Sequence, residues 1–175
     1  VRMVSFKGDK GFMYKANLSL RTALKILKPI YFFKARDENG LYKGISGVNW
    51  SKFLSANQTF VIDATVHSEY FNHSEFVSQK CKDAIVDQFR ERTGQRPSIE
   101  KIHPDLRINF HIDKDQVSVA LDTSGNSLHQ RGYRTATNIA PINEVLAAGI
   151  LLLSGWDGQG DFLDPMCGSG TFLAE

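Results

Sequence analysis

The sequence predicts an α/β (α+β) fold, and three patterns along the chain lead to that prediction. Residues 59–66 alternate apolar and polar side chains, as a strand with one buried face does. Residues 74–92 place apolar side chains in one stripe at helical spacing, after a serine that suits a helix start. Residues 106–121 alternate again on both sides of a turn at 113–115, which predicts a two-stranded hairpin.

The first 35 residues predict a short β-α-β fragment. A strand is expected at 3–7, a helix at 10–20 and a second strand at 24–33, bent or placed at an edge by Pro29. The fragment is too small to bury an apolar core of its own. We therefore expect it to be the remainder of a unit whose earlier part is absent.

The elements that follow continue the mixed pattern. Short helices are predicted at 41–48 and 50–54, between a polar turn and the strand at 59–66. After the hairpin, a linker leads to a mostly apolar helix that Pro141 is expected to open and that ends near residue 155. A last strand is predicted at 161–164. Residues after about 155 are expected to be poorly ordered or to pack only on neighbours, since one strand cannot make a sheet.

Charge is spread unevenly along the 175 residues, although the net charge is only +2. Residues 1–34 carry eight Lys or Arg against one Asp, so the remaining residues carry a net negative charge. This asymmetry indicates an end of the chain that faces a polyanion, and a solvated basic surface is the alternative.

Several classes of protein are disfavoured by composition. The longest apolar run, residues 145–153, is too short to cross a bilayer, and the start of the chain does not resemble an export signal. Only two cysteines are present, so we expect reduced thiols and a cytoplasmic protein. His67, His73 and His103 lack the spacing of metal ligands, so no metal site is expected. Trp50 and the aromatic residues 31–33 are predicted to lie in the core.

The segment with the most specific chemistry is 164–171, Asp-Pro-Met-Cys-Gly-Ser-Gly-Thr. A predicted strand ends on an acid, turns through two glycines and opens into a helix, which is how open α/β sheets bind adenine-ribose cofactors. A phosphate-binding P-loop is excluded because Thr171, not Lys, follows the second glycine. Leu173 stands where a dinucleotide fingerprint needs a third glycine or alanine. A purely structural turn before a helix remains the alternative for a lone pair of glycines.

This segment resembles the first cofactor motif of class I S-adenosylmethionine-dependent methyltransferases, in the branch that methylates amino groups of nucleic acids. Residues 128–134 (LHQRGYR) and 140–144 (APINE) resemble the junction before the catalytic domain in THUMP-containing RNA methyltransferases. Residues 82–87 (KDAIVD) and 104–107 (PDLR) are similar to the THUMP domain of that family. Within it, the chain resembles bacterial enzymes that methylate the exocyclic N2 of a guanine in 23S ribosomal RNA.

The resemblance implies a domain organisation and a function. Residues 1–35 would be a partial N-terminal ferredoxin-like domain, 36–130 a THUMP RNA-binding domain, and 131–175 the junction and start of a Rossmann-like methyltransferase domain. The chain would be the RNA-binding front part of an rRNA methyltransferase that uses S-adenosylmethionine. Structured RNA, 23S rRNA in particular, is the expected partner, and no obligate protein partner is inferred.

The resemblance also implies a cofactor site. Its residues would hold the methionine and ribose end of S-adenosylmethionine: Asp164, Pro165, Cys167, Gly168, Ser169, Gly170, Ala140 and Pro141. The family's catalytic Asn-Pro-Pro-aromatic motif is expected beyond Glu175. This chain alone is therefore expected to be inactive and to bind S-adenosylmethionine weakly or not at all.

The linker from 123 to 143 contains no acidic residue, and four of its side chains are candidates for RNA contact: His129, Arg131, Tyr133 and Arg134. Guanidinium groups beside an aromatic ring suit phosphates and an unstacked base. The alternative is that Tyr133 packs on the domain junction while the arginines pair with local carboxylates. Lys82 on the long helix is a further candidate, with a solvated helix face as the alternative.

Two other functions remain open from the sequence. The chain could be a non-enzymatic THUMP-type RNA-binding module, or a fragment of a DNA amino-methyltransferase. A hairpin-bearing α/β domain in front of the cofactor motif favours RNA over DNA.

Overall fold

The computed structural model describes residues 3–134 and 141–175, and they form two compact units. The sheet unit comprises residues 27–123, and the terminal unit comprises residues 1–26 together with 124–175. Ala140, which the sequence assigns to the cofactor site, lies outside the described residues.

The sheet unit is built on a five-stranded mixed sheet with the order β1-β5-β4-β2-β3. The β4–β5 hairpin and the β1–β5 pair are antiparallel, whereas β2 runs parallel to both β4 and β3. The strands are β1 Leu27–Lys34, β2 Thr59–His67, β3 Ser98–Ile99, β4 Leu106–Asp113 and β5 Gln116–Asp122. The predictions of β2, β4 and β5 are confirmed almost to the residue.

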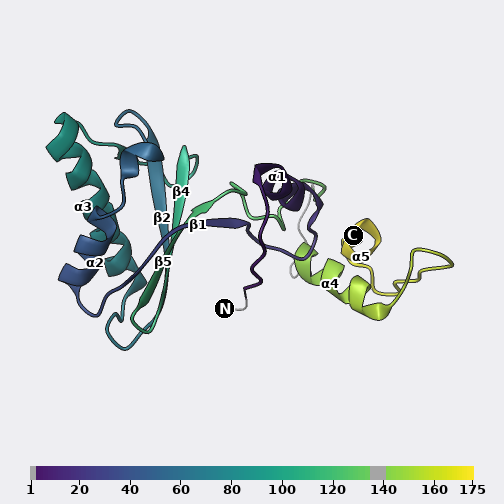
Figure 1. Cartoon of the computed structure of the whole chain (residues 1–175). Coiled ribbons are helices and arrows are strands. Elements are labelled where there is room, and N and C mark those ends of the chain that lie inside the picture. Colours follow the sequence, from purple (N-terminus) through teal and green to yellow (C-terminus); the bar gives the residue numbers. More distant parts are fainter. Residues whose placement is uncertain (1–2, 135–140) are drawn as a thin grey trace. The chain divides into compact units, whose positions relative to one another are not determined.

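Helices α2 Glu38–Ser46 and α3 Ser74–Thr93, with the 3-10 turn η1 Trp50–Lys52, cover one face of this sheet (Figure 1). Their apolar side chains and the even-numbered residues of β2 and β4 form one core. The cap of α3 differs from the prediction: His73 stands at the cap position without a side-chain hydrogen bond. Gly94 closes the helix in the left-handed conformation (φ 69°), which glycine adopts without strain.

Gln88 of α3 joins the helices where the short turn η1 enters the core. Its side-chain amide donates to the carbonyl oxygens of Ser46 and Val48 at 2.9 and 2.8 Å. Its carbonyl oxygen accepts from the backbone N–H of Trp50 at 3.0 Å. The Trp50 side chain is fully buried and donates to the carbonyl of Ile45, so its predicted place in the core is confirmed.

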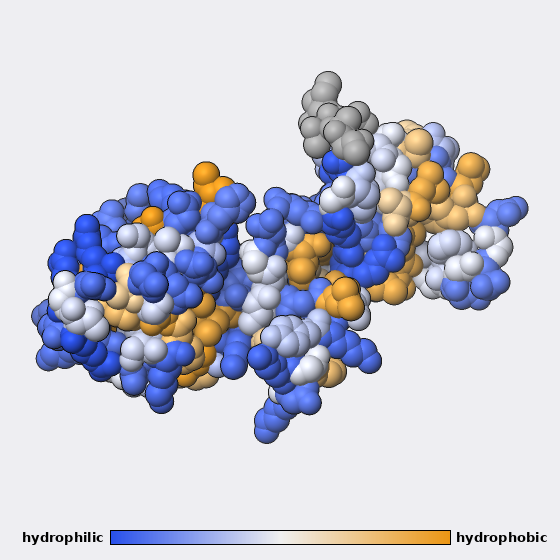
Figure 2. All heavy atoms as spheres, turned by 90° about the horizontal axis from the view of Figure 1, so that it is seen from above, coloured by the Kyte–Doolittle hydropathy of each residue, from blue (hydrophilic) through white to orange (hydrophobic). Residues whose placement is uncertain are grey.

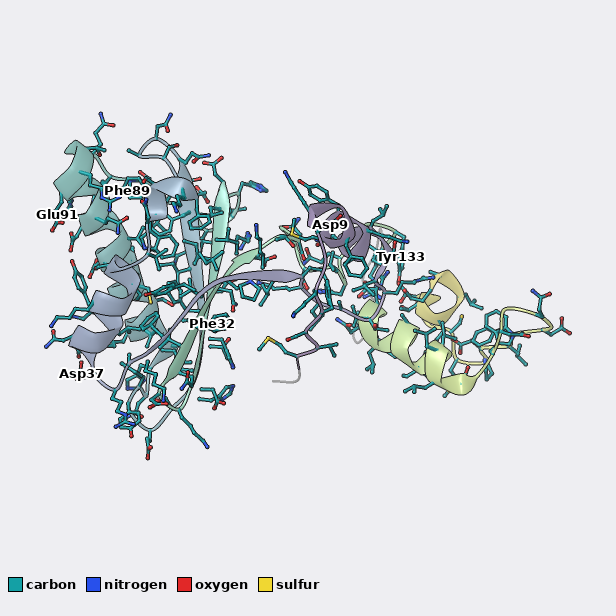
Figure 3. All side chains as sticks on the ribbon, in the orientation of Figure 1. Asp9, Phe32, Asp37, Phe89, Glu91 and Tyr133 are labelled. Carbon is teal, nitrogen blue, oxygen red and sulfur yellow. The ribbon has the colours of Figure 1, made fainter. Side chains whose placement is uncertain are left out.

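The strand β1 corrects two expectations. It begins at Leu27 and pairs with β5 of the sheet unit, with an irregularity between Pro29 and Tyr31, and residues 3–9 form no strand. The predicted β-α-β fragment is therefore wrong, because the strand meant to pair with residues 3–7 pairs with β5 instead. Phe32 is 66% exposed on the face away from the helices, so its predicted core position is also wrong (Figure 3).

The described residues of the terminal unit form three helices, α1 Lys10–Ser19, α4 Glu144–Ser154 and α5 Thr171–Ala174. Asp9 caps α1 by accepting from the N–H of Phe12. Helix α4 begins after Asn143, whose side chain accepts from two backbone N–H groups, and not at Pro141 as predicted. An Asn side chain can satisfy these free N–H groups, which a proline cannot do.

No strand forms at 161–164, which corrects the last predicted element. A strand exists only when a neighbour pairs with its backbone, and this segment has none among the described residues. Trp156 donates to the carbonyl of Gln159 and its ring contacts Phe162, so this segment packs on its neighbours. The same expectation is wrong further along the chain, where Thr171 and Glu175 contact Arg134 and Arg21. Apolar surface gathers over the region from α4 to α5 (Figure 2), with Leu153 and Met166 almost fully exposed.

Candidate functional site

The candidate site begins with the glycine turn, residues 164–170, which leads directly into α5. One carboxylate oxygen of Asp164 accepts from the N–H of Met166 at 3.1 Å, and the N–H of Gly170 donates to the carbonyl of Cys167 at 2.7 Å. Gly168 and Gly170 have φ of 53° and 72°. Side-chain-bearing residues rarely adopt this left-handed conformation, so the turn requires glycine at both positions.

The backbone of this turn faces open space. Apart from each glycine and its chain neighbours, no described residue has an atom within 4 Å of the position that a Cβ would take on Gly168 or Gly170. Cys167, Gly168 and Ser169 are exposed. A ligand can therefore approach the backbone of the turn directly, which is the access that a small adenosyl cofactor needs. The predicted cofactor residue Pro165 is exposed beside the turn, and Pro141 is half-buried before α4.

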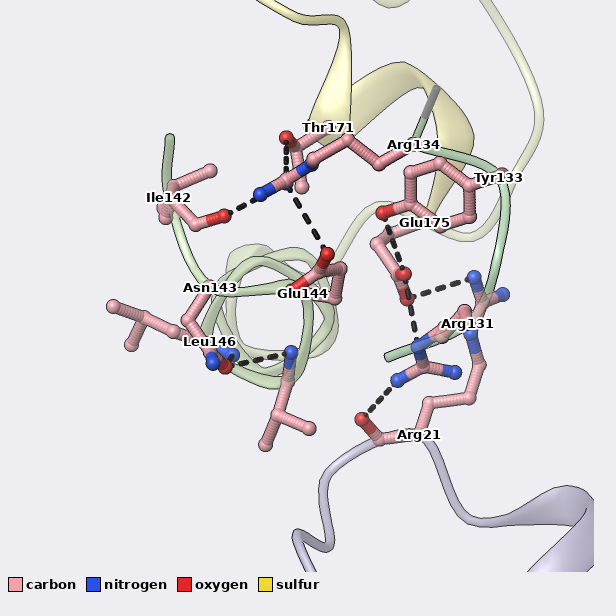
Figure 4. Close-up of polar contacts among 11 residues, drawn as sticks. Arg21, Arg131, Tyr133, Arg134, Ile142, Asn143, Glu144, Leu146, Thr171 and Glu175 are labelled. Atoms are coloured by element: carbon pink, nitrogen blue, oxygen red, sulfur yellow. Dashed lines mark hydrogen bonds and ion pairs between the residues drawn. The ribbon is translucent and has the colours of Figure 1, made fainter. Parts of the chain in front are cut away.

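Arg134 holds the first residue of α5 (Figure 4). Its Nη2 donates to the hydroxyl of Thr171 at 2.9 Å and to the carbonyl oxygen of Ile142 at 3.1 Å, and lies 3.3 Å from the carboxylate of Glu144. Glu144 and Thr171 are both buried. The guanidinium group therefore connects the start of α4 with the start of α5.

Glu175 closes the other end of α5, and its side chain is fully buried. Arg21 donates to one carboxylate oxygen at 2.9 Å. The second oxygen accepts from the Tyr133 hydroxyl at 3.0 Å and lies 3.0 Å from Nε of Arg131 (Figure 4). Two guanidinium groups and a phenol thus surround one carboxylate.

The Tyr133 phenol is affected by this environment. Burial raises its pKa above the ordinary value, and the hydrogen bond to Glu175 and the negative charge of that carboxylate raise the pKa further. The phenol therefore stays protonated and donates to Glu175 across the physiological pH range.

Four of the five predicted RNA contacts meet carboxylates in the structure: Arg131, Tyr133, Arg134 and Lys82. Arg131 and Tyr133 bind Glu175, and Arg134 binds Glu144, so the alternative reading of these side chains describes their contacts. His129 lies 2.8 Å from the Ser127 hydroxyl and is half-buried.

Lys82, the fifth candidate, lies in the sheet unit beside a hollow of about 390 Å³ between α3 and β3. The hollow is also lined by Arg90 and Arg96. Lys82 pairs with Asp83 at 3.0 Å and Arg90 lies 3.6 Å from Asp87, whereas Arg96 has no ion pair among the described residues.

Sequence reasoning missed the partners that organise this site: Arg21, Glu144, Thr171 and Glu175. The sequence held one signal for two of them. Thr171 and Glu175 are four residues apart, and residues with that spacing lie on one face of a helix, so a shared set of partners could have been expected.

Residues 3–134 and 141–175 contain no helix of the length and apolarity that crossing a bilayer requires. They also contain no group of three or more His, Cys, Asp or Glu arranged to hold a metal ion.

Three known domain families match this chain. The THUMP domain family matches residues 35–122, half of the chain. The chain belongs to the THUMP-domain family. An RlmL ferredoxin-like domain matches residues 1–27 before the THUMP domain, and an RMKL-like methyltransferase domain matches residues 131–175 after it. The three domain types that the motifs indicate are therefore confirmed.

Individual relatives match nearly the whole length of this chain. The ribosomal RNA large subunit methyltransferase K/L of Syntrophotalea carbinolica is 46% identical over 98% of this chain. A structure from Listeria monocytogenes strain 4b F2365, named a predicted N6-adenine-specific DNA methylase, is 32% identical over 95% of the chain with a TM-score of 0.80. SMU.472, named as a methyltransferase complexed with SAH, is 35% identical over 94% of the chain with a TM-score of 0.78.

The chain spans 24% of the curated relative and 44% of each of these two solved chains. The activity and substrates of a whole relative are therefore not read directly onto these 175 residues.

Proposed function

We propose that this chain is the RNA-binding front part of a methyltransferase that transfers a methyl group from S-adenosylmethionine to 23S rRNA, with the exocyclic N2 of a guanine as the target. The single observation that carries the proposal is the glycine turn. It combines two glycines of positive φ, an open backbone and an acidic residue, directly before a helix.

The residues present fit the cofactor. Asp164, Pro165, Cys167, Gly168, Ser169 and Gly170 would hold the methionine and ribose end, and Ala140 and Pro141 are further candidates. The carboxylate of Asp164 suits an ammonium group, and the exposed backbone of Gly168 and Ser169 admits close approach. S-adenosylmethionine supplies the activated methyl group when bound. The complexed relative SMU.472, with SAH, supports the same choice of cofactor.

The RNA partner is proposed on the THUMP domain and on the cations of the hollow beside α3. Lys82, Arg90 and Arg96 line that hollow, and Arg96 is free among the described residues to meet a phosphate. In the sequence, the THUMP match precedes the methyltransferase match. We propose domain boundaries at 35/36 and 130/131. A ribosomal substrate and reduced cysteines suit a cytoplasmic protein.

A DNA amino-methyltransferase is the second candidate, because the Listeria relative is named as a DNA methylase. Titration of the chain with structured ribosomal RNA and with duplex DNA, each at two salt concentrations, separates the two candidates. The proposal expects tighter binding to RNA at both salt concentrations. Equal affinities that fall together with salt would remove the claim of RNA specificity.

Variants of the hollow sharpen this experiment. Arg96→Gln and Lys82→Gln should each lower the slope of log affinity against log salt by about 1, because each removes one phosphate contact. Lys114→Gln is the matched control, since Lys114 is an exposed cation at the hairpin, at the other end of β4 from β3. An equal effect of all three substitutions would argue against the hollow as the RNA surface.

A further inference from the structure

Helix α5 is held at both ends by one short segment, residues 131–134. We propose that Arg134 and Glu175 are positioning residues that fix α5 from its two ends and so set where the glycine turn presents its backbone. The inference rests on the proposed function, in which this turn holds the methyl donor.

The backbone hydrogen bonds at the start of α5 do not connect it to another element. They run from Ala174 to Gly170 and from Glu175 to Thr171, both at 3.0 Å, and so lie within this turn of helix. The contacts that connect the start of α5, and the turn that precedes it, to neighbouring segments are made by side chains.

The first of these contacts is made by Arg134 at Thr171. The guanidinium nitrogen that donates to the Thr171 hydroxyl also donates to the carbonyl oxygen of Ile142 and lies beside the carboxylate of Glu144, at distances of 2.9 to 3.3 Å. Because the guanidinium is planar and rigid, these partners restrict its orientation closely. Thr171 is buried and adjoins Gly170, so its hydroxyl ties the end of the turn to the start of α4.

The second contact is made at Glu175. Its fully buried carboxylate faces Arg21, Arg131 and Tyr133 at 2.9 to 3.0 Å. A buried carboxylate is stable only with such partners, so movement of α5 away from them is costly. The two contacts lie at opposite ends of the helix, and together they leave it little freedom to rotate or slide.

The experiment measures backbone order at the turn in the 175-residue chain. Nitrogen-15 relaxation of residues 168–174 is recorded for the unmodified chain, Thr171→Val, Thr171→Ser and Glu175→Gln. Valine has the shape of threonine without the hydroxyl, whereas serine keeps the hydroxyl. Glu91→Gln on the exposed face of α3 is the matched control for a removed carboxylate.

The proposal predicts order parameters of about 0.8 for the unmodified chain, Thr171→Ser and Glu91→Gln, and about 0.6 or less for Thr171→Val and Glu175→Gln. The values for α4 should stay unchanged in every variant. Unchanged order in both Thr171→Val and Glu175→Gln would overturn the proposal. An equal loss of order across α4 and α5 would also overturn it, because the contacts would then stabilise the whole terminal unit and not the position of the turn.

This readout needs no cofactor, so it is independent of the proposed function. Suppose that the turn loosens as predicted but the protein encoded by the gene that contains this sequence methylates no RNA. The positioning role then stands and the proposed function fails. If methylation is found but the turn keeps its order in both variants, the positioning role fails alone.

Discussion

The hydroxyl of Tyr133 donates a hydrogen bond of 3.0 Å to the carboxylate of Glu175, 42 residues further along the chain. The same carboxylate pairs with Arg21 and Arg131, so the end of α5 meets segments from both parts of the terminal unit. This contact gives the aromatic residue of the junction a definite structural partner, and it has a consequence that a titration can measure.

Glu175→Gln should lower the pKa of Tyr133 toward its ordinary value of 10.0, because a neutral amide removes the negative charge that disfavours the phenolate. Burial, the larger cause, remains, so the shift should be partial. The ring signals of Tyr133, identified by comparison with Tyr133→Phe, report the titration by NMR. A Tyr133 pKa that is identical in Glu175→Gln and the unmodified chain would contradict the contact.

The sign of the pH dependence follows from the same group. The folded pKa of Tyr133 is raised, so its contribution to stability is fully present below about pH 10 and is lost as the pH rises through the folded pKa. Because Glu175→Gln brings the folded pKa of Tyr133 closer to its unfolded value, the alkaline limb of the unfolding curve of the terminal unit should be flatter in this variant than in the unmodified chain.

Gln88→Leu should destabilise the sheet unit by about 2 to 3 kcal/mol, because the N–H of Trp50 and the carbonyl oxygens of Ser46 and Val48 lose their buried partner. Urea unfolding followed by the fluorescence of Trp50 measures the difference. Gln95→Leu, on the exposed loop after α3, is the matched control. Equal unfolding midpoints for the two variants would show that the buried amide of Gln88 does not stabilise the sheet unit by this amount.

The two cysteines should differ sharply in reactivity. Cys167 is exposed in the glycine turn, whereas Cys81 is fully buried on α3, and burial raises the pKa of the Cys81 thiol. An aromatic disulfide reagent should therefore modify one thiol per folded chain at neutral pH and the second only after unfolding. Cys167→Ser should abolish the reaction of the folded chain. Rapid reaction of both thiols would contradict the packing of α3.

Asp105 links the starts of β2 and β4. Its carboxylate accepts from the backbone N–H and the hydroxyl of Thr59 at 2.8 and 2.9 Å, and these hydrogen bonds lower its pKa, the backbone bond most. A lowered folded pKa means that the contribution to stability is present above the unfolded value of 3.8 and is lost as the pH falls through the folded pKa.

Asp105→Asn should accordingly flatten the acid limb of the unfolding curve of the sheet unit between about pH 5 and about pH 2. Thr59→Ala, which removes the hydroxyl but keeps the backbone donor, should flatten it less. Acid limbs of equal steepness in all three proteins would mean that the Asp105 carboxylate has no such role.

The strands β2 and β4 and the helix α3 could be predicted because their periodicity is local and long. The two-residue strand β3 could not, since it is exposed and exists only through its pairing with Thr59 and Phe60. The reverse error occurred at 3–7 and 161–164, where strand-like composition met no partner. Strand formation depends on a neighbour that may lie anywhere in the sequence, so composition alone cannot decide it.

The candidate site shows the same limit. The two glycines of the turn follow from the motif, and the structure gives both a positive φ. The arginines and tyrosine of the junction carry no local sign of their partners, because Glu144 and Glu175 lie ten or more residues away. A stretch without acids suggests RNA contact, yet its cations reach carboxylates supplied by α4 and by the end of α5.

The central claim is that this chain belongs to an enzyme that methylates the N2 amino group of a guanine in 23S rRNA. The most direct measurement is mass-spectrometric mapping of base methylation in cells with and without the gene that encodes this sequence. The account predicts that one N2-methylguanine of 23S rRNA disappears on deletion and returns when the gene is restored. An unchanged set of 23S rRNA methylations, together with a loss of N6-methyladenine from DNA, would contradict it.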